Sequence, residues 1–223
     1  MPAFQFLILS LIFCLFRRKL GWGTAGLFIL LCLALEPLAS IFHPLAPDHH
    51  GLQSFSAFLA FCCLYFGGMG WVRTEASAAA AVSPPRAFLP LQVPPPAEAR
   101  RWFAAAGFFC AAGLWLGATV WTFAFAITAA CALAVLPFWK ASAPPEARYD
   151  PVLWRTWAWT GGLFAAAFYL LEYAPHHMAM RLEVNHPLYW LCWLGTAECL
   201  VFAARSSSLR FWNNRRAREW LLL

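Results

Sequence analysis

The sequence predicts an all-α fold, a polytopic transmembrane helix bundle of about seven spans, with the N-terminus outside and the C-terminus cytoplasmic. Hydrophobic residues make up 62% of the 223 residues and charged residues only 12%, against roughly 45–50% and 25% in soluble domains. The apolar residues form consecutive runs, most of them near the ~20 residues that a helix needs to cross the hydrocarbon layer. The basic residues between these runs gather on one side, which fixes the orientation.

The first apolar run, near residues 2–16, is short, and the basic cluster Arg17–Lys19 follows it while no Lys or Arg precedes it. That order is the reverse of a signal peptide and predicts an uncleaved span that enters from outside. The remaining predicted spans lie near 20–42, 52–72, 101–117, 118–139, 154–174 and 187–204.

Residues 101–139 form one apolar stretch, which as a single helix would be about 58 Å long. That is too long for one crossing, so we predict a tight hairpin near Gly113–Gly117. The same GxxxG pattern could instead be a helix-packing face.

The basic residues support one transmembrane domain at 1–208. With seven spans, all but one of the 16 Lys and Arg residues fall on the same side, and only Arg181 lies opposite. Because cytoplasmic loops are enriched in Lys and Arg, that side is cytoplasmic, as in a multi-pass protein of the bacterial inner membrane. The net charge of +6 is thus explained by the orientation of the chain in the membrane, and no nucleic-acid partner is expected.

Two polar segments are predicted on the cytoplasmic side. Residues 76–100 are rich in Ala and Pro and are expected to be a linker. Residues 209–223 interleave arginines with Trp and Leu, as in a helix lying on the inner leaflet. Several tryptophans near span ends are expected to be interfacial anchors: Trp22, Trp71, Trp102, Trp139, Trp154 and Trp190.

The candidate functional residues gather on the predicted outer side. All six histidines lie there: His43, His49, His50, His176, His177 and His186. Glu36 and Glu172 lie one or two turns before the outer ends of their spans, and Glu198 lies in the middle of the last span. A carboxylate at membrane depth is costly, so each of the three suggests a functional site.

Helical spacing links some of these residues. Glu36 and His43 are seven apart and Glu172 and His176 are four apart, so each pair shares one helix face. We therefore predict one pocket, opening outward, with Glu198 deepest. The histidines would be metal ligands and the glutamates catalytic acids, bases or proton carriers. Its lining would be Glu36, His43, Glu172, His176, His186 and Glu198.

Imidazole with carboxylate suits a divalent metal such as Zn, Fe or Cu; haem between two histidines or acid–base catalysis without metal are alternatives. The nucleotide-binding GxxxxGK[ST], zinc-protease HExxH and hydrolase GxSxG motifs are absent. The favoured function is an enzyme acting on a membrane lipid or lipid-linked substrate at the outer face. A proton-coupled carrier, or a structural or assembly subunit with a membrane-protein partner or a second copy of itself, remains an alternative.

Overall fold

The computed structural model describes residues 2–34, 50–74, 93–118, 121, 124–133, 147–173 and 185–206. These residues are predominantly helical, which confirms the predicted helical class. The chain forms two compact units, Met1–Phe55 and Ser56–Leu223, which are described separately. The helices are α1 (Pro2–Leu20), α2 (Trp22–Ala34), α3 (His50–Phe66), α4 (Pro96–Leu116), α6 (Val152–Glu172) and α7 (Pro187–Ser206), and a further helical stretch covers Ala124–Leu133.

The first unit contains a hairpin of α1 and α2. Gly21, with a φ of 85°, links the two helices in a conformation that favours glycine. Near this turn Phe16 stacks on Phe28 at 4.6 Å. Helix α1 runs to Leu20, beyond the predicted end at residue 16, and its 19 residues span about 28 Å. The basic cluster Arg17–Lys19 thus belongs to the last helical turn, where cations complement the helix dipole.

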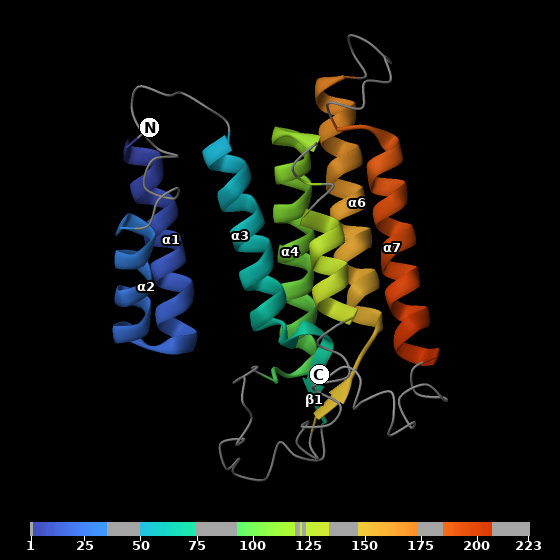
Figure 1. Cartoon of the computed structure of the whole chain (residues 1–223), viewed down its shortest axis with the longest axis horizontal. Coiled ribbons are helices and arrows are strands. Elements are labelled where there is room, and N and C mark those ends of the chain that lie inside the picture. Colours follow the sequence, from blue (N-terminus) through green and yellow to red (C-terminus); the bar gives the residue numbers. More distant parts are fainter. Residues whose placement is uncertain are drawn as a thin grey trace, which may run out of the picture. The chain divides into compact units, whose positions relative to one another are not determined.

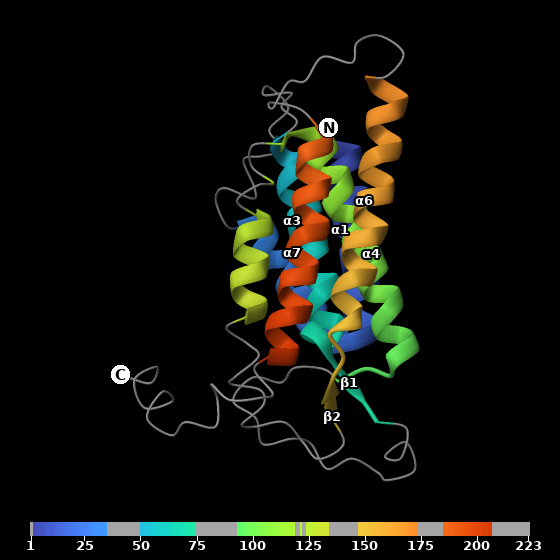
Figure 2. The same cartoon turned by 90° about the vertical axis from the view of Figure 1, so that its right-hand side faces the viewer.

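In the second unit, α6 packs against α4 on one side and α7 on the other (Figures 1 and 2). Helices α4 and α6 run parallel, because Phe103 contacts Trp154 near their starts and Trp115 stacks on Phe168 near their ends. Helix α7 runs antiparallel to α6. Between α4 and α6 the chain returns through Ala124–Leu133, so the apolar stretch 101–139 is divided after Leu116.

Glycines bring three helices close together. A Cβ at Gly107 of α4 would lie only 2.5 Å from the Trp157 carbonyl oxygen and 2.9 Å from the Gly161 nitrogen. A Cβ at Gly161 would overlap the ring of Trp193 on α7, and one at Gly113 would overlap Trp121. Small residues at helix contacts are typical of membrane bundles, where close backbone approach supplies much of the attraction.

Large aromatic side chains fill the space beside these glycines. Trp154, Trp157 and Trp193 are buried and meet edge to face, at 5.7 Å between the first two and 5.1 Å between the last two. Phe125 packs on Trp193 at 4.5 Å. The prediction that Trp154 is an interfacial anchor was therefore wrong, and Trp71 is buried as well. Position near a span end did not reveal which tryptophans are buried in the core.

A two-stranded antiparallel ribbon lies at one end of the second unit (Figure 1). It pairs β1 (Trp71–Arg73) with β2 (Ala147–Tyr149), and the sequence did not predict it. Tyr149 packs against Gly70, where a Cβ would lie 2.5 Å from its ring, and Gly70 has a φ of 99°. The linker predicted at residues 76–100 ends earlier than expected, because α4 begins at Pro96, four residues before Arg100. The φ of proline suits the first position of a helix.

The ribbon marks the basic end of this unit. Every Lys and Arg that the structure describes here lies in the ribbon or in the helical turns beside it: Arg73, Arg100, Arg101, Arg148, Arg155 and Arg205.

Among the described residues, α7 is the one helix long and apolar enough to cross a membrane, over Pro187–Arg205. Shorter apolar helices cover Trp22–Leu33, Gly51–Phe66 and Ala124–Leu133. Large apolar side chains are exposed on the outer faces of α6 and α7, among them Leu163, Leu171 and Phe202. Such surface is unusual for a protein surrounded by water, and it indicates association with a membrane.

Tyr149 makes the ribbon sensitive to alkaline pH. Burial raises the pKa of Tyr149 from 10 to about 12, against the opposing effect of the hydrogen bond that the Trp154 indole N–H donates to its hydroxyl at 2.7 Å. The neutral phenol is therefore favoured in the fold, and stability of about 2–3 kcal/mol is present below pH 10 and lost as pH rises toward 12. In detergent, the wild-type melting temperature should fall over this range more steeply than that of Tyr149→Phe. Parallel curves would contradict the assignment.

Candidate functional site

The structure describes three of the six predicted site residues. Glu36, His43 and His176 lie outside the described residues. The other three are His186, immediately before α7, Glu172, the last residue of α6, and Glu198, in the second half of α7.

His186 and its neighbour Asn185 are buried, with 6% and 0% of their surfaces exposed. The Asn185 amide donates a hydrogen bond to the Ala165 carbonyl oxygen at 2.7 Å, which ties the segment to α6. His186 caps α7, because its Nδ1 accepts the backbone N–H of Leu188 at 3.0 Å. Two atoms, His186 Nε2 and Asn185 Oδ1, have no hydrogen-bond partner among the described residues.

The cap decides what His186 can offer a ligand. Because Nδ1 accepts a hydrogen bond, the neutral imidazole carries its proton on Nε2. Nε2 is then a donor and lacks the free electron pair that binding a metal requires. The predicted role of His186 as a metal ligand therefore conflicts with this geometry, and hydrogen-bond donation agrees with it.

The Asn185–His186 segment lies beside α6 at some distance from the carboxyl end of that helix. Ala165, which it contacts, is seven residues before Glu172, and this places the segment about 10 Å from that end along the helix axis. Burying polar atoms without hydrogen-bond partners is costly, and the pair is therefore a candidate functional site.

Glu172 is held at the end of α6 that lies above this segment. It is seven residues beyond the buried Ala165 and four beyond Phe168, so it continues their face of the helix. Its carboxylate accepts a hydrogen bond from the Trp115 indole N–H of α4, and the Trp115 ring stacks on Phe168 at 5.0 Å. Glu172 is exposed at the carboxyl end of α6.

Glu198 lies far from His186 and belongs to a different part of the helices. It lies twelve residues after His186, about 18 Å along α7, toward the basic end. Arg155 of α6 binds both of its carboxylate oxygens, each at 2.7 Å. A carboxylate held in this way by guanidinium is neutralised in place, and the predicted role of Glu198 as the deep member of an outer pocket is not supported by this arrangement.

No group of three or more His, Cys, Asp or Glu side chains within the described ranges could hold a metal ion. Asn185 and Trp115 are the polar site residues that the sequence reasoning missed. The signal for Asn185 was Asn-His-Pro directly before an apolar run, since Asn and His are potential caps and Pro favours the first helical turn. Nothing in the sequence pairs Trp115 with Glu172.

No protein-family profile, curated protein or solved structure matches this chain.

Proposed function

We propose that the chain is a multi-pass protein of the bacterial inner membrane with seven spans, its N-terminus outside and its C-terminus cytoplasmic. The apolar outer faces of α6 and α7 support a lipid environment. The basic residues of the second unit at the ribbon end agree with the positive-inside rule. The antiparallel run of α6 and α7 and the returning stretch Ala124–Leu133 give the alternation of direction that successive spans require.

We further propose that the outer end of α6 and α7 binds the polar head of a lipid or lipid-linked substrate, on which the protein acts as an enzyme. The observation that carries this proposal is the buried Asn185–His186 pair, with its donor at Nε2 and its acceptor at Oδ1. A donor beside an acceptor suits a hydroxyl group, and the donor alone suits a carbonyl or phosphoryl oxygen.

Within this site His186 and Glu172 would have different chemical roles. The Nε2–H of His186 would polarise a substrate oxygen by donating to it. Glu172 would move a proton as a general acid or base, oriented by the indole of Trp115. The substrate's apolar tail would remain in lipid beside the exposed side chains of α6.

The test is His186→Asn, because Asn is a strong helix N-cap but lacks the Nε2 donor. The variant should insert and melt like the wild type, yet retain about fivefold less of any lipid that copurifies, since one lost hydrogen bond to a buried site is worth about 1 kcal/mol. Native mass spectrometry of the detergent-purified protein measures the retained lipid.

Glu172→Gln should leave lipid retention unchanged and abolish turnover of the retained substrate. The matched control is Glu98→Gln, near the start of α4, where Gln can still accept the bond from the Trp102 indole. If His186→Asn and Glu98→Gln retain lipid equally, the polar pair is structural.

A second function, a subunit of a larger membrane complex, is favoured by the Arg155–Glu198 pair. Its two side chains are 37% and 54% exposed on α6 and α7, on helices that we place in the membrane. Arg155 lies in the first turn of α6, at the end proposed to be cytoplasmic, and a protein partner that covers the exposed pair would shield it from water and strengthen it.

A further inference from the structure

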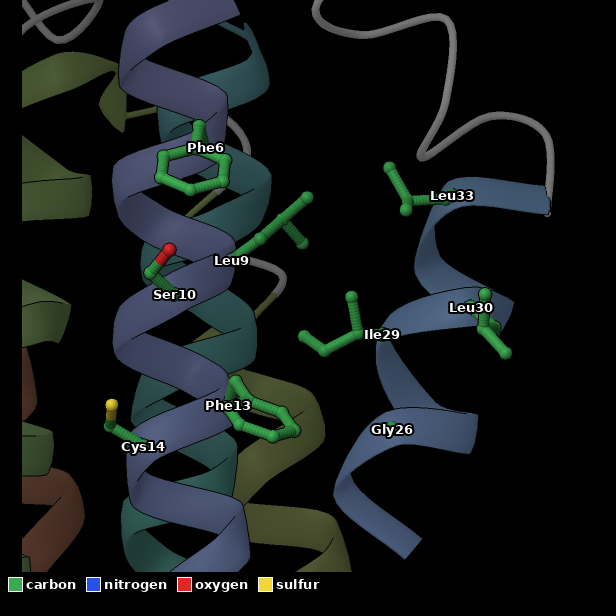
Figure 3. A pocket seen from close by; sticks show the side chains of 9 residues that line it. All are labelled: Phe6, Leu9, Ser10, Phe13, Cys14, Gly26, Ile29, Leu30 and Leu33. Atoms are coloured by element: carbon green, nitrogen blue, oxygen red, sulfur yellow. The ribbon is translucent and has the colours of Figure 1, made fainter. Parts of the chain in front are cut away.

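A groove of about 810 Å³ runs between α1 and α2. Figure 3 shows Leu9 and Phe13 of α1 and Ile29 of α2 pointing toward one another across it. The lining is almost wholly apolar, with Ser10 as its one hydroxyl. The complete lining is Phe6, Leu9, Ser10, Phe13, Cys14, Gly26, Ile29, Leu30 and Leu33.

Gly26 leaves the α2 wall of the groove open. A Cβ at this position would meet nothing within 4 Å. Near the turn the hairpin is tightly closed, by the stacked pair Phe16 and Phe28 and by the edge contact of Phe13 with Trp22 at 5.5 Å. The groove therefore has a closed end beside the turn.

Positive charge lies at the closed end. Arg17, Arg18 and Lys19 form the last turn of α1, and the Arg17 guanidinium lies 4.9 Å from the centre of the Trp22 ring. From Phe6 to Arg18 the helix rises about 18 Å, close to the ~15 Å of hydrocarbon in one leaflet. The site thus combines an apolar channel one leaflet deep with a cationic head.

We infer that this groove binds one anionic phospholipid of the inner leaflet, with an acyl chain between α1 and α2 and the phosphate at Arg17–Lys19. The inference rests on the proposed topology, which places Arg17–Lys19 on the cytoplasmic side. An acyl chain fits a lining whose one hydroxyl is that of Ser10, whereas an extended peptide would bring polar backbone that this lining does not satisfy. The basic cluster selects an anionic head over a zwitterionic one.

The experiment reconstitutes the full-length chain in vesicles of equal phosphatidylglycerol and phosphatidylcholine, then extracts it gently for native mass spectrometry. The wild type should retain phosphatidylglycerol in preference to phosphatidylcholine. Gly26→Leu places a side chain in the groove and should reduce this retention about tenfold. Gly23→Leu is the matched control: it lies on the same helix in equally open space but outside the groove, and it should behave like the wild type.

Arg17→Gln/Arg18→Gln should abolish the preference for the anionic lipid, by roughly tenfold or more given the contribution of each basic residue near anionic headgroups. Equal retention by Gly26→Leu and Gly23→Leu, or a wild type without preference, would overturn the groove as a phospholipid site. Flotation of the vesicles distinguishes failure of the groove proposal from failure of the proposed membrane topology. A chain that does not float with the lipid would overturn the topology as well as the groove.

Discussion

Gly161→Ala is expected to destabilise the protein by about 1–3 kcal/mol. A Cβ at Gly161 would overlap the ring of Trp193, which is 1% exposed and is held by Phe125 and Trp157. The ring has no room to move, so α6 and α7 would have to separate. Overpacking of this kind usually costs about 1–3 kcal/mol, and here it would also weaken the neighbouring contact with Gly107 of α4.

The adjacent Gly162→Ala is the control. Its added Cβ would lie 3.7 Å from the Leu194 side chain, an ordinary contact. Both substitutions gain the same helix propensity, about 1 kcal/mol for Ala over Gly, so the difference between them isolates the overlap. Thermal unfolding in detergent should show Gly161→Ala melting well below the wild type and Gly162→Ala at or slightly above it. Equal melting temperatures would show that α6 and α7 are not packed as described.

Reporter fusions should give an all-or-none result for topology. A fluorescent protein joined after Leu223 should fluoresce, because that terminus is predicted to be cytoplasmic. Alkaline phosphatase joined after Tyr173, at the outer end of α6, should be active, because it folds only outside the cytoplasm. The physical basis is the basic side of the chain, which resists transfer across the membrane.

The reciprocal fusions serve as controls: the phosphatase after Leu223 and the fluorescent protein after Tyr173 should both be inactive. If both positions report the same side, an odd number of spans between α6 and the terminus is excluded, and the seven-span proposal fails. The outer-face site would fail with it, since Glu172 and His186 would then lie on another side or depth.

The helices were predictable because long apolar runs carry their own signal. A run such as 154–174 can be read without knowing its neighbours, and α6 at Val152–Glu172 lies within two residues of it. The ribbon was not predictable, because β1 and β2 are three residues each and lie more than seventy residues apart. Their pairing depends on α3, α4 and α6 bringing both segments to one end of the unit.

The candidate site was partly predictable, because an ionisable residue beside or within an apolar run is also a local signal in the sequence. Such a position suggests burial, and this proved right for His186 but wrong for Glu172 and Glu198, which are exposed. The partner of each residue is set by helix packing that no spacing encodes. Arg155 was counted only as a cytoplasmic charge, yet it binds Glu198, and the cap made by His186 turns an expected ligand into a donor.

The contact of Gly107 with the backbone of α6 has a consequence for how the chain is made. On the proposed topology α4 and α6 are parallel and are not consecutive spans, so α4 would leave the translocon well before its partner has been translated. During that interval its glycine face would be without α6 and open to other contacts, such as lipid or a helper protein. Pairing of α4 with α6 would therefore wait until both the stretch Ala124–Leu133 and α6 itself have been translated and inserted. On this topology the pairing is a late event in biogenesis. Before it happens, quality-control proteases could recognise the unfinished chain.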